Sequence, residues 1–149
     1  MRTLTPQERQ FKALMRIWTA LFAIGGLAFL LAGDWVITAG NDFASQVLHW
    51  DLPPMPPTSH SLWLILTTAM MATITVLCYW IQKDVVHHLH LTLLLLISKG
   101  TAAALFLVFF FLEAPFFNYL LGALVSDGPI FVITLIFYRR VLKWRQKSD

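Results

Sequence analysis

Charged residues are scarce in this sequence. Only 13% of its 149 residues are charged, whereas 58% are hydrophobic; a soluble domain has about 25% charged residues. The apolar residues form long runs separated by short charged patches, which excludes a disordered chain, a nucleic-acid-binding tail and an ordinary soluble core. We therefore expect an integral membrane protein that is surrounded by the lipid bilayer and has no nucleic-acid partner.

Several catalytic signatures are also missing. The single cysteine, Cys78, lies inside an apolar run, so chemistry based on paired thiols is excluded. The sequence has no His/Glu pair of the zinc-protease kind, no Gly-rich phosphate loop and no Gly-x-Ser-x-Gly elbow. These absences favour a non-enzymatic protein without a cofactor.

Four apolar segments have the length of about 20 residues that a helix needs to cross a bilayer. They cover residues 17–38, 61–81, 91–112 and 117–138. The alternating pattern of barrel strands is absent, and a helix satisfies its own backbone in lipid. The sequence thus predicts an all-α integral membrane protein, a four-transmembrane-helix up-down bundle that forms one domain over residues 1–149.

The basic residues predict how this bundle is oriented. Apart from Lys99, they all lie before the first span, between the second and third, or after the fourth: Arg2, Arg9, Lys12, Arg16, Lys83, Arg139, Arg140, Lys143, Arg145 and Lys147. The opposite segments, 39–60 and 113–116, contain acidic residues and no basic residue. The positive-inside rule places both termini in the cytoplasm, and we expect a bacterial inner (plasma) membrane.

The segments outside the spans are short. In the outer loop, 39–60, Phe43, Val47 and Trp50 have helical spacing, which predicts a short helix on the membrane interface. A polyproline-like tether follows, with Pro53, Pro54, Pro56 and Pro57. Near the N-terminus, the sequence from Thr5 to Glu8 is typical of a helix start, and we expect a short basic helix there that lies on the headgroups.

Two charged residues interrupt the third and fourth spans. Lys99 lies about 12 Å from the cytoplasmic edge and Asp127 about 16 Å, at 1.5 Å per residue. A tight turn joins their helices, and an unpaired charge at mid-bilayer costs at least about 2.5–3.5 kcal/mol. We therefore expect Lys99 and Asp127 to form an ion pair.

Further polar residues flank both charges. Ser98 and Thr101 surround Lys99, and Ser126 precedes Asp127, so the sequence predicts one polar cluster. Pro129 predicts a kink or break in the helix, which resembles in kind the discontinuous helices of transporters. The cluster is either a proton, ion or substrate site, or a lock that fixes the register of two helices.

Histidines near the third span are weak metal-binding candidates. His87 and His90 are three residues apart and could share a helical face, but only Asp84 is available to complete a site. Haem between helices would need histidines that face each other across the bundle. We therefore expect interfacial histidines, no metal and no haem.

The sequence leaves three functions open. The first is a non-enzymatic accessory or scaffolding subunit of a larger membrane assembly, with a membrane-protein partner or a homo-oligomer. The second is a small ion- or proton-linked transporter or channel centred on Asp127 and the Pro129 break. The third is an intramembrane enzyme that acts on a lipid or quinone.

Overall fold

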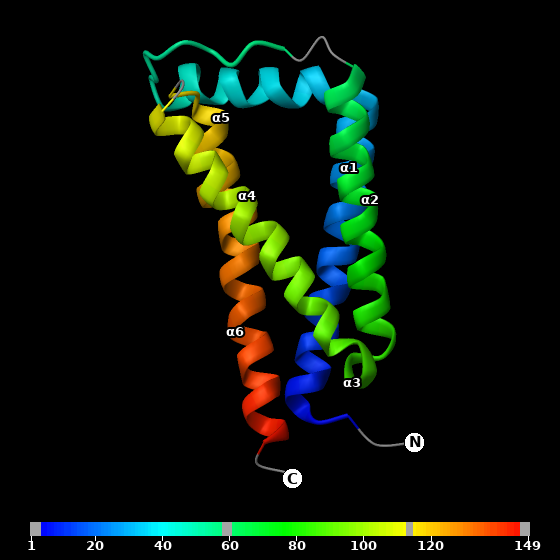
Figure 1. Ribbon diagram of the computed structural model, residues 1–149. Helices are drawn as coiled ribbons and strands as arrows, with labels where there is room; N and C mark the ends of the chain where they lie inside the picture. Colours follow the sequence, from blue (N-terminus) through cyan, green and yellow to red (C-terminus); the bar gives the residue numbers. More distant parts are fainter. Residues whose placement is uncertain (1–3, 58–60, 113–114, 147–149) are drawn as a thin grey trace.

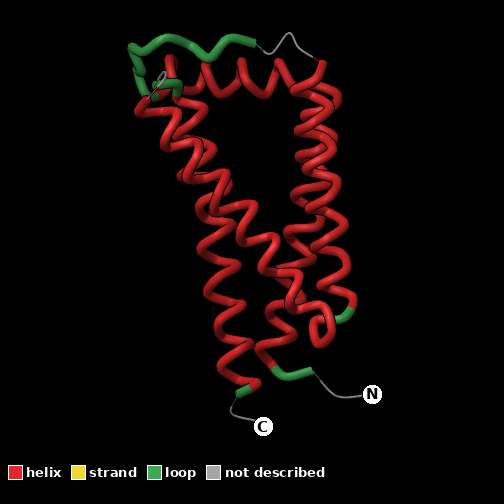
Figure 2. The backbone as a smooth tube through the Cα atoms, in the orientation of Figure 1, coloured by secondary structure: helices red, strands yellow, loops and turns green. Residues whose placement is uncertain are grey.

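Helices are the regular secondary structure of the described part of the chain. The computed structural model describes residues 4–57, 61–112 and 115–146, and no strand occurs in them (Figures 1 and 2). Four of its helical stretches are long and apolar enough to cross a membrane: Pro6–Val47, Leu64–Lys83, Val85–Leu112 and Phe117–Arg145. The prediction of an all-α fold with four apolar helices is therefore confirmed.

Helix α1 (Pro6–Val47) begins where the sequence predicts. The Thr5 side chain accepts a hydrogen bond from Glu8 N, while Thr5 N donates to the Glu8 carboxylate at 2.9 Å. The prediction of a short surface helix was wrong, because this segment is the beginning of α1, which continues into the segment predicted as the first span. Its early residues Phe11 and Met15 are fully buried, so this segment belongs to the core.

Helix α1 bends inside the segment predicted as the first span. Ala32 leaves helical geometry (φ −149°, ψ 38°), and Gly33 follows it. Beyond this kink α1 turns aside and lies across the end of the molecule opposite the termini (Figure 1). The segment predicted as the first span, 17–38, therefore contains a bend. The short helix predicted in the outer loop is the second part of α1, which begins directly after the kink at Ala32 and ends at Val47. Glycine next to the kink lowers the cost of leaving the helix.

The remaining helices follow the predicted order. Helix α2 (Ser61–Lys83) packs along α1, and a link formed by α3 (Val85–His88) and η1 (Leu89–Leu91) leads into α4 (Thr92–Leu112). Helix α5 (Phe117–Leu120), the π-helical segment η2 (Leu121–Asp127) and α6 (Gly128–Arg145) complete the chain.

The core lies at the end of the molecule that holds both termini. Its buried residues come from the first half of α1, the last half of α2, the link and the adjoining turns of α4 and α6: Phe11, Leu14, Met15, Trp18, Phe22, Ile74, Cys78, Ile81, Val85, Leu89, Leu95, Ile130 and Val141. Away from this end, α4 crosses from α2 toward α5 and η2, and the α1–α2 pair diverges from it (Figure 1). No residue of α4 after Lys99 is buried.

Candidate functional site

Lys99 and Asp127 meet where α4 crosses the fourth helical stretch. Lys99 Nζ donates a hydrogen bond to Asp127 Oδ1 at 2.9 Å, and the two residues are 1% and 7% exposed. The ammonium also lies over the ring of Phe22, 4.6 Å from its centroid. An aromatic face attracts a cation most strongly where water is excluded, so α1 contributes to holding the charge of Lys99.

The neighbouring hydroxyls do not join this pair. Thr101 and Ser126 are exposed and Ser98 is half-buried, and in the described chain none of them bonds to either charge. The expected polar cluster is therefore reduced to the ion pair. Helical phase is the reason: a residue one or two positions from Lys99 points about 100° or 200° away from it.

The chain does not break at Pro129. Instead, η2 is a seven-residue π-helical segment that ends at Asp127, and the Gly128 N–H donates to the Ala123 carbonyl. This wider turn accommodates a helix position at which proline cannot donate and would clash with the carbonyl four residues earlier. The predicted break is thus a change from π to α geometry, and it aligns Asp127 with Lys99.

Gly128 is required by this π turn. A Cβ atom added at Gly128 would overlap the Ala123 carbonyl oxygen, a contact that only a shift of the backbone could relieve. Gly128 and Pro129 therefore have two separate effects on the helix. Pro129 favours the irregular turn, and Gly128 permits its close approach to the preceding carbonyl.

A second buried hydrogen bond lies on the same side of the core. Trp18 Nε1 donates to Thr134 Oγ1 at 3.0 Å, and Thr134 is completely buried. It connects α1 to α6, whereas the ion pair connects α4 to η2. Sequence reasoning missed this contact. The only available signal was a hydroxyl inside an apolar span, and span hydroxyls more often bond to their own helix backbone.

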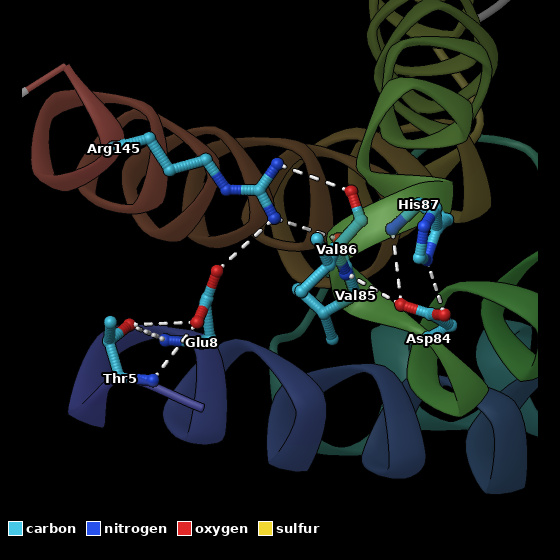
Figure 3. A network of polar contacts seen from close by, with 7 residues as sticks. All are labelled: Thr5, Glu8, Asp84, Val85, Val86, His87 and Arg145. Carbon is cyan, nitrogen blue, oxygen red and sulfur yellow. Dashed lines mark hydrogen bonds and ion pairs between the residues drawn. The ribbon is translucent and has the colours of Figure 1, made fainter. Parts of the chain in front are cut away.

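The ends of the chain are joined by Arg145. Its guanidinium donates to the Glu8 carboxylate at 3.2 Å and to the carbonyls of Val85 and Val86 at 3.2 and 3.3 Å (Figure 3). Glu8 is 1% exposed, so its charge is neutralised inside the structure. Arg145, predicted only as part of the basic flank, connects α1, α3 and α6.

His87 and His90, the weak metal-ligand candidates, lie against residues of their own segment. His87 Nδ1 lies 2.6 Å from Asp84 Oδ2, and His90 Nδ1 lies 3.1 Å from the His87 carbonyl oxygen. Among the residues the structure describes, no group of three or more His, Cys, Asp and Glu side chains could hold a metal ion. Asp84 is the N-cap of α3, and the backbone N–H and ring of His87 keep its pKa below the usual value.

A third polar group holds the far end of α1. The Asn118 amide donates to Asn41 Oδ1 at 3.0 Å, and Asn41 in turn bonds to both the N–H and the carbonyl of Met55. A Cβ atom at Gly40 would overlap the Asn118 side chain, so glycine permits this approach. The proline-rich tether is thereby fixed against α1 and α5.

Comparison with protein-family models, with curated proteins and with solved structures finds no match to this chain. The function is therefore inferred from the side chains of the chain itself, above all from Lys99 and Asp127. Lys99 and Asp127 form a buried ion pair, and none of the hydrogen bonds described above connects it to another polar side chain among the described residues. Such a pair can fix two helices in register.

Proposed function

We propose that this protein is a non-enzymatic accessory or scaffolding subunit of a larger membrane assembly. It spans the membrane four times, with both termini on the cytoplasmic side. The placement of its basic residues supports this orientation. A bacterial inner membrane is the proposed location.

The observation that carries the proposal is the exposed face of α4 beyond Lys99; another face of the same turns packs against α5 and η2, where Phe106 lies against Tyr119. No residue of α4 after Lys99 is fully buried. Thr101 and Ala104, three positions apart, have small side chains that are exposed. Small residues allow close helix–helix approach in membranes. The Lys99–Asp127 pair fixes the start of α4 against η2, so the rest of the helix is held in place for a partner helix.

Site-specific photo-cross-linking tests the proposal in intact membranes. A benzophenone side chain at Val108, on the exposed face of α4, is expected to give one adduct of defined mass, either with another protein or with a second copy. The matched control is Ile17 on α1, which is 58% exposed against 46% for Val108. Only monomer at both positions, together with a monomer in native mass spectrometry after gentle extraction, would refute the proposal.

A small ion- or proton-linked transporter or channel is the second candidate. It is favoured by the π-helical segment that ends at Asp127, because π turns occur often at functional sites. Flux measurements on the purified protein in liposomes test it. Flux that Asp127→Asn abolishes would favour transport, and no flux under pH or ion gradients would exclude it. No structural observation favours the third candidate, a lipid- or quinone-modifying enzyme.

A further inference from the structure

Three basic residues share one face of α1 near its start. Arg9, Lys12 and Arg16 follow one another at intervals of three and four residues, which places them on the same side of a helix. Arg9 and Arg16 are exposed and Lys12 is half-buried, whereas Phe11 and Met15 occupy the buried side of the same turns. The three residues, here called the basic stripe, therefore lie on the outside of the molecule.

The basic stripe has no acidic partner in the described part of the chain. Its side chains take part in none of the ion pairs found there. Glu8, the nearest acid in the sequence, pairs with Arg145. Asp84, which follows α2, pairs with His87. Like charges three and four residues apart on a helix repel each other, and an anion from outside the chain would relieve this repulsion.

The depth of the basic stripe in the membrane follows from the kink in α1. Beyond Ala32 the helix lies across the far end of the molecule (Figure 1), so the part that crosses the membrane ends there. A helix needs about 20 residues to cross the hydrocarbon, and this length counted back from Ala32 reaches Lys12. Arg16 then lies one turn, about 6 Å, inside the boundary. From that depth an arginine extends its charged end toward the headgroups.

The same face of α1 continues as an apolar surface toward the middle of the membrane. Ala20, Ala23 and Leu27 follow Arg16 at helical spacing, and all three are exposed. Two of them are alanines, so a chain of methylene groups can lie close to the helix backbone. Cations at headgroup level and an apolar strip beside them match the order in which a phospholipid carries its phosphate and its acyl chains.

We propose that the basic stripe binds an anionic phospholipid in the leaflet on the side of the termini. Arg16 and Lys12 hold the lipid phosphate, since a guanidinium matches two phosphate oxygens at once. One acyl chain lies along Ala20 and Ala23. A zwitterionic lipid brings its own ammonium and leaves the repulsion among the three cations uncompensated, so the lipid needs a net negative charge. The site depends on the proposed membrane-spanning arrangement and not on the accessory role.

Native mass spectrometry of the full chain, released from detergent micelles with added lipid, tests this proposal. Phosphatidylglycerol is expected to form a saturable adduct with the protein. Phosphatidylcholine has the same phosphate beside a quaternary ammonium group, and it is expected to bind at least about fivefold more weakly. Equal affinity for the two lipids, or no phosphatidylglycerol adduct at all, would overturn the proposal.

Two charge variants give the matched comparison. Arg16→Gln removes one cation of the basic stripe and is expected to weaken phosphatidylglycerol binding about fivefold. Arg139→Gln removes an equally exposed cation from α6 and is expected to leave binding within about twofold. Lys12→Gln repeats the comparison at a second position of the stripe, so the test does not depend on the folding of one variant. Equal losses in the α1 and α6 variants would show general charge attraction and overturn the site.

An acidic segment of a partner protein is the alternative occupant of the basic stripe. A co-purifying protein that Arg16→Gln releases, with phosphatidylglycerol binding unchanged, would assign the stripe to that partner and overturn the lipid site. The Val108 cross-link reports on α4, whereas the lipid adduct reports on α1. Failure of the lipid site and failure of the accessory role are therefore distinguishable.

Discussion

Breaking the Lys99–Asp127 pair is the most direct test of the structural reasoning. Lys99→Met leaves a buried carboxylate without its cation, and Asp127→Asn leaves a buried ammonium without its anion. At 2.9 Å and an effective dielectric constant of about 20, the attraction between the two charges is about 6 kcal/mol. Part of this offsets desolvation, so each single substitution should lower the free energy of unfolding by about 3–5 kcal/mol.

The double substitution separates pairing from simple packing. It removes both charges at once, so it should cost less than either single change. Reversible unfolding in mixed micelles, followed by tryptophan fluorescence, gives the free energies. Lys143→Met removes an exposed lysine and serves as the control, with an expected change within about 0.5 kcal/mol. Additive effects of Lys99→Met and Asp127→Asn would refute the pair.

Three further predictions concern the helix ends and the π turn. Gly128→Ala forces a Cβ atom against the Ala123 carbonyl and should lower the free energy of unfolding by at least about 1–3 kcal/mol in the same assay. The control, Gly25→Ala, meets nothing within 4 Å and should be neutral or stabilising. Equal effects of the two substitutions would argue against the π geometry. Arg145→Lys should speed amide exchange in α3, because an ammonium cannot replace the forked guanidinium; unchanged exchange would contradict the bridging role. The pKa of Asp84 is lowered by the His87 backbone N–H and ring, so its stabilising effect is complete above the unfolded pKa of about 3.9 and is lost as pH falls through the lower folded pKa. Melting temperatures of wild type and Asp84→Asn should converge at low pH, and a constant difference between pH 6 and pH 3 would contradict this.

The sequence predicted the helices better than their internal irregularities. Hydropathy alone indicates α2 and α4, because the length of each apolar run determines where the helix begins and ends. The kink at Ala32 has no proline to indicate it, and Gly33 is a weak signal. At Pro129 the sequence correctly indicated an irregular helix, but whether the chain breaks or widens into a π turn depends on packing against α4.

The candidate site was predictable only in part. A short connection between two helices and the high cost of unpaired charges in lipid are enough to pair Lys99 with Asp127. The flanking hydroxyls lie away from the pair, because residues one or two positions apart on a helix occupy different faces. The contact of Arg145 with Glu8 joins residues 137 positions apart, and nothing local in either segment specifies its partner.

That separation also has a consequence for synthesis. After Glu8 has been made, 137 further residues are added before its guanidinium partner exists, which takes about 7–27 s at 5–20 residues per second. During that interval the carboxylate that is buried in the finished protein has no cation from α6, and the first turn of α1 cannot complete its packing. The order of chain growth therefore makes the N-terminal end of the first helix one of the last parts of the molecule to reach its final environment.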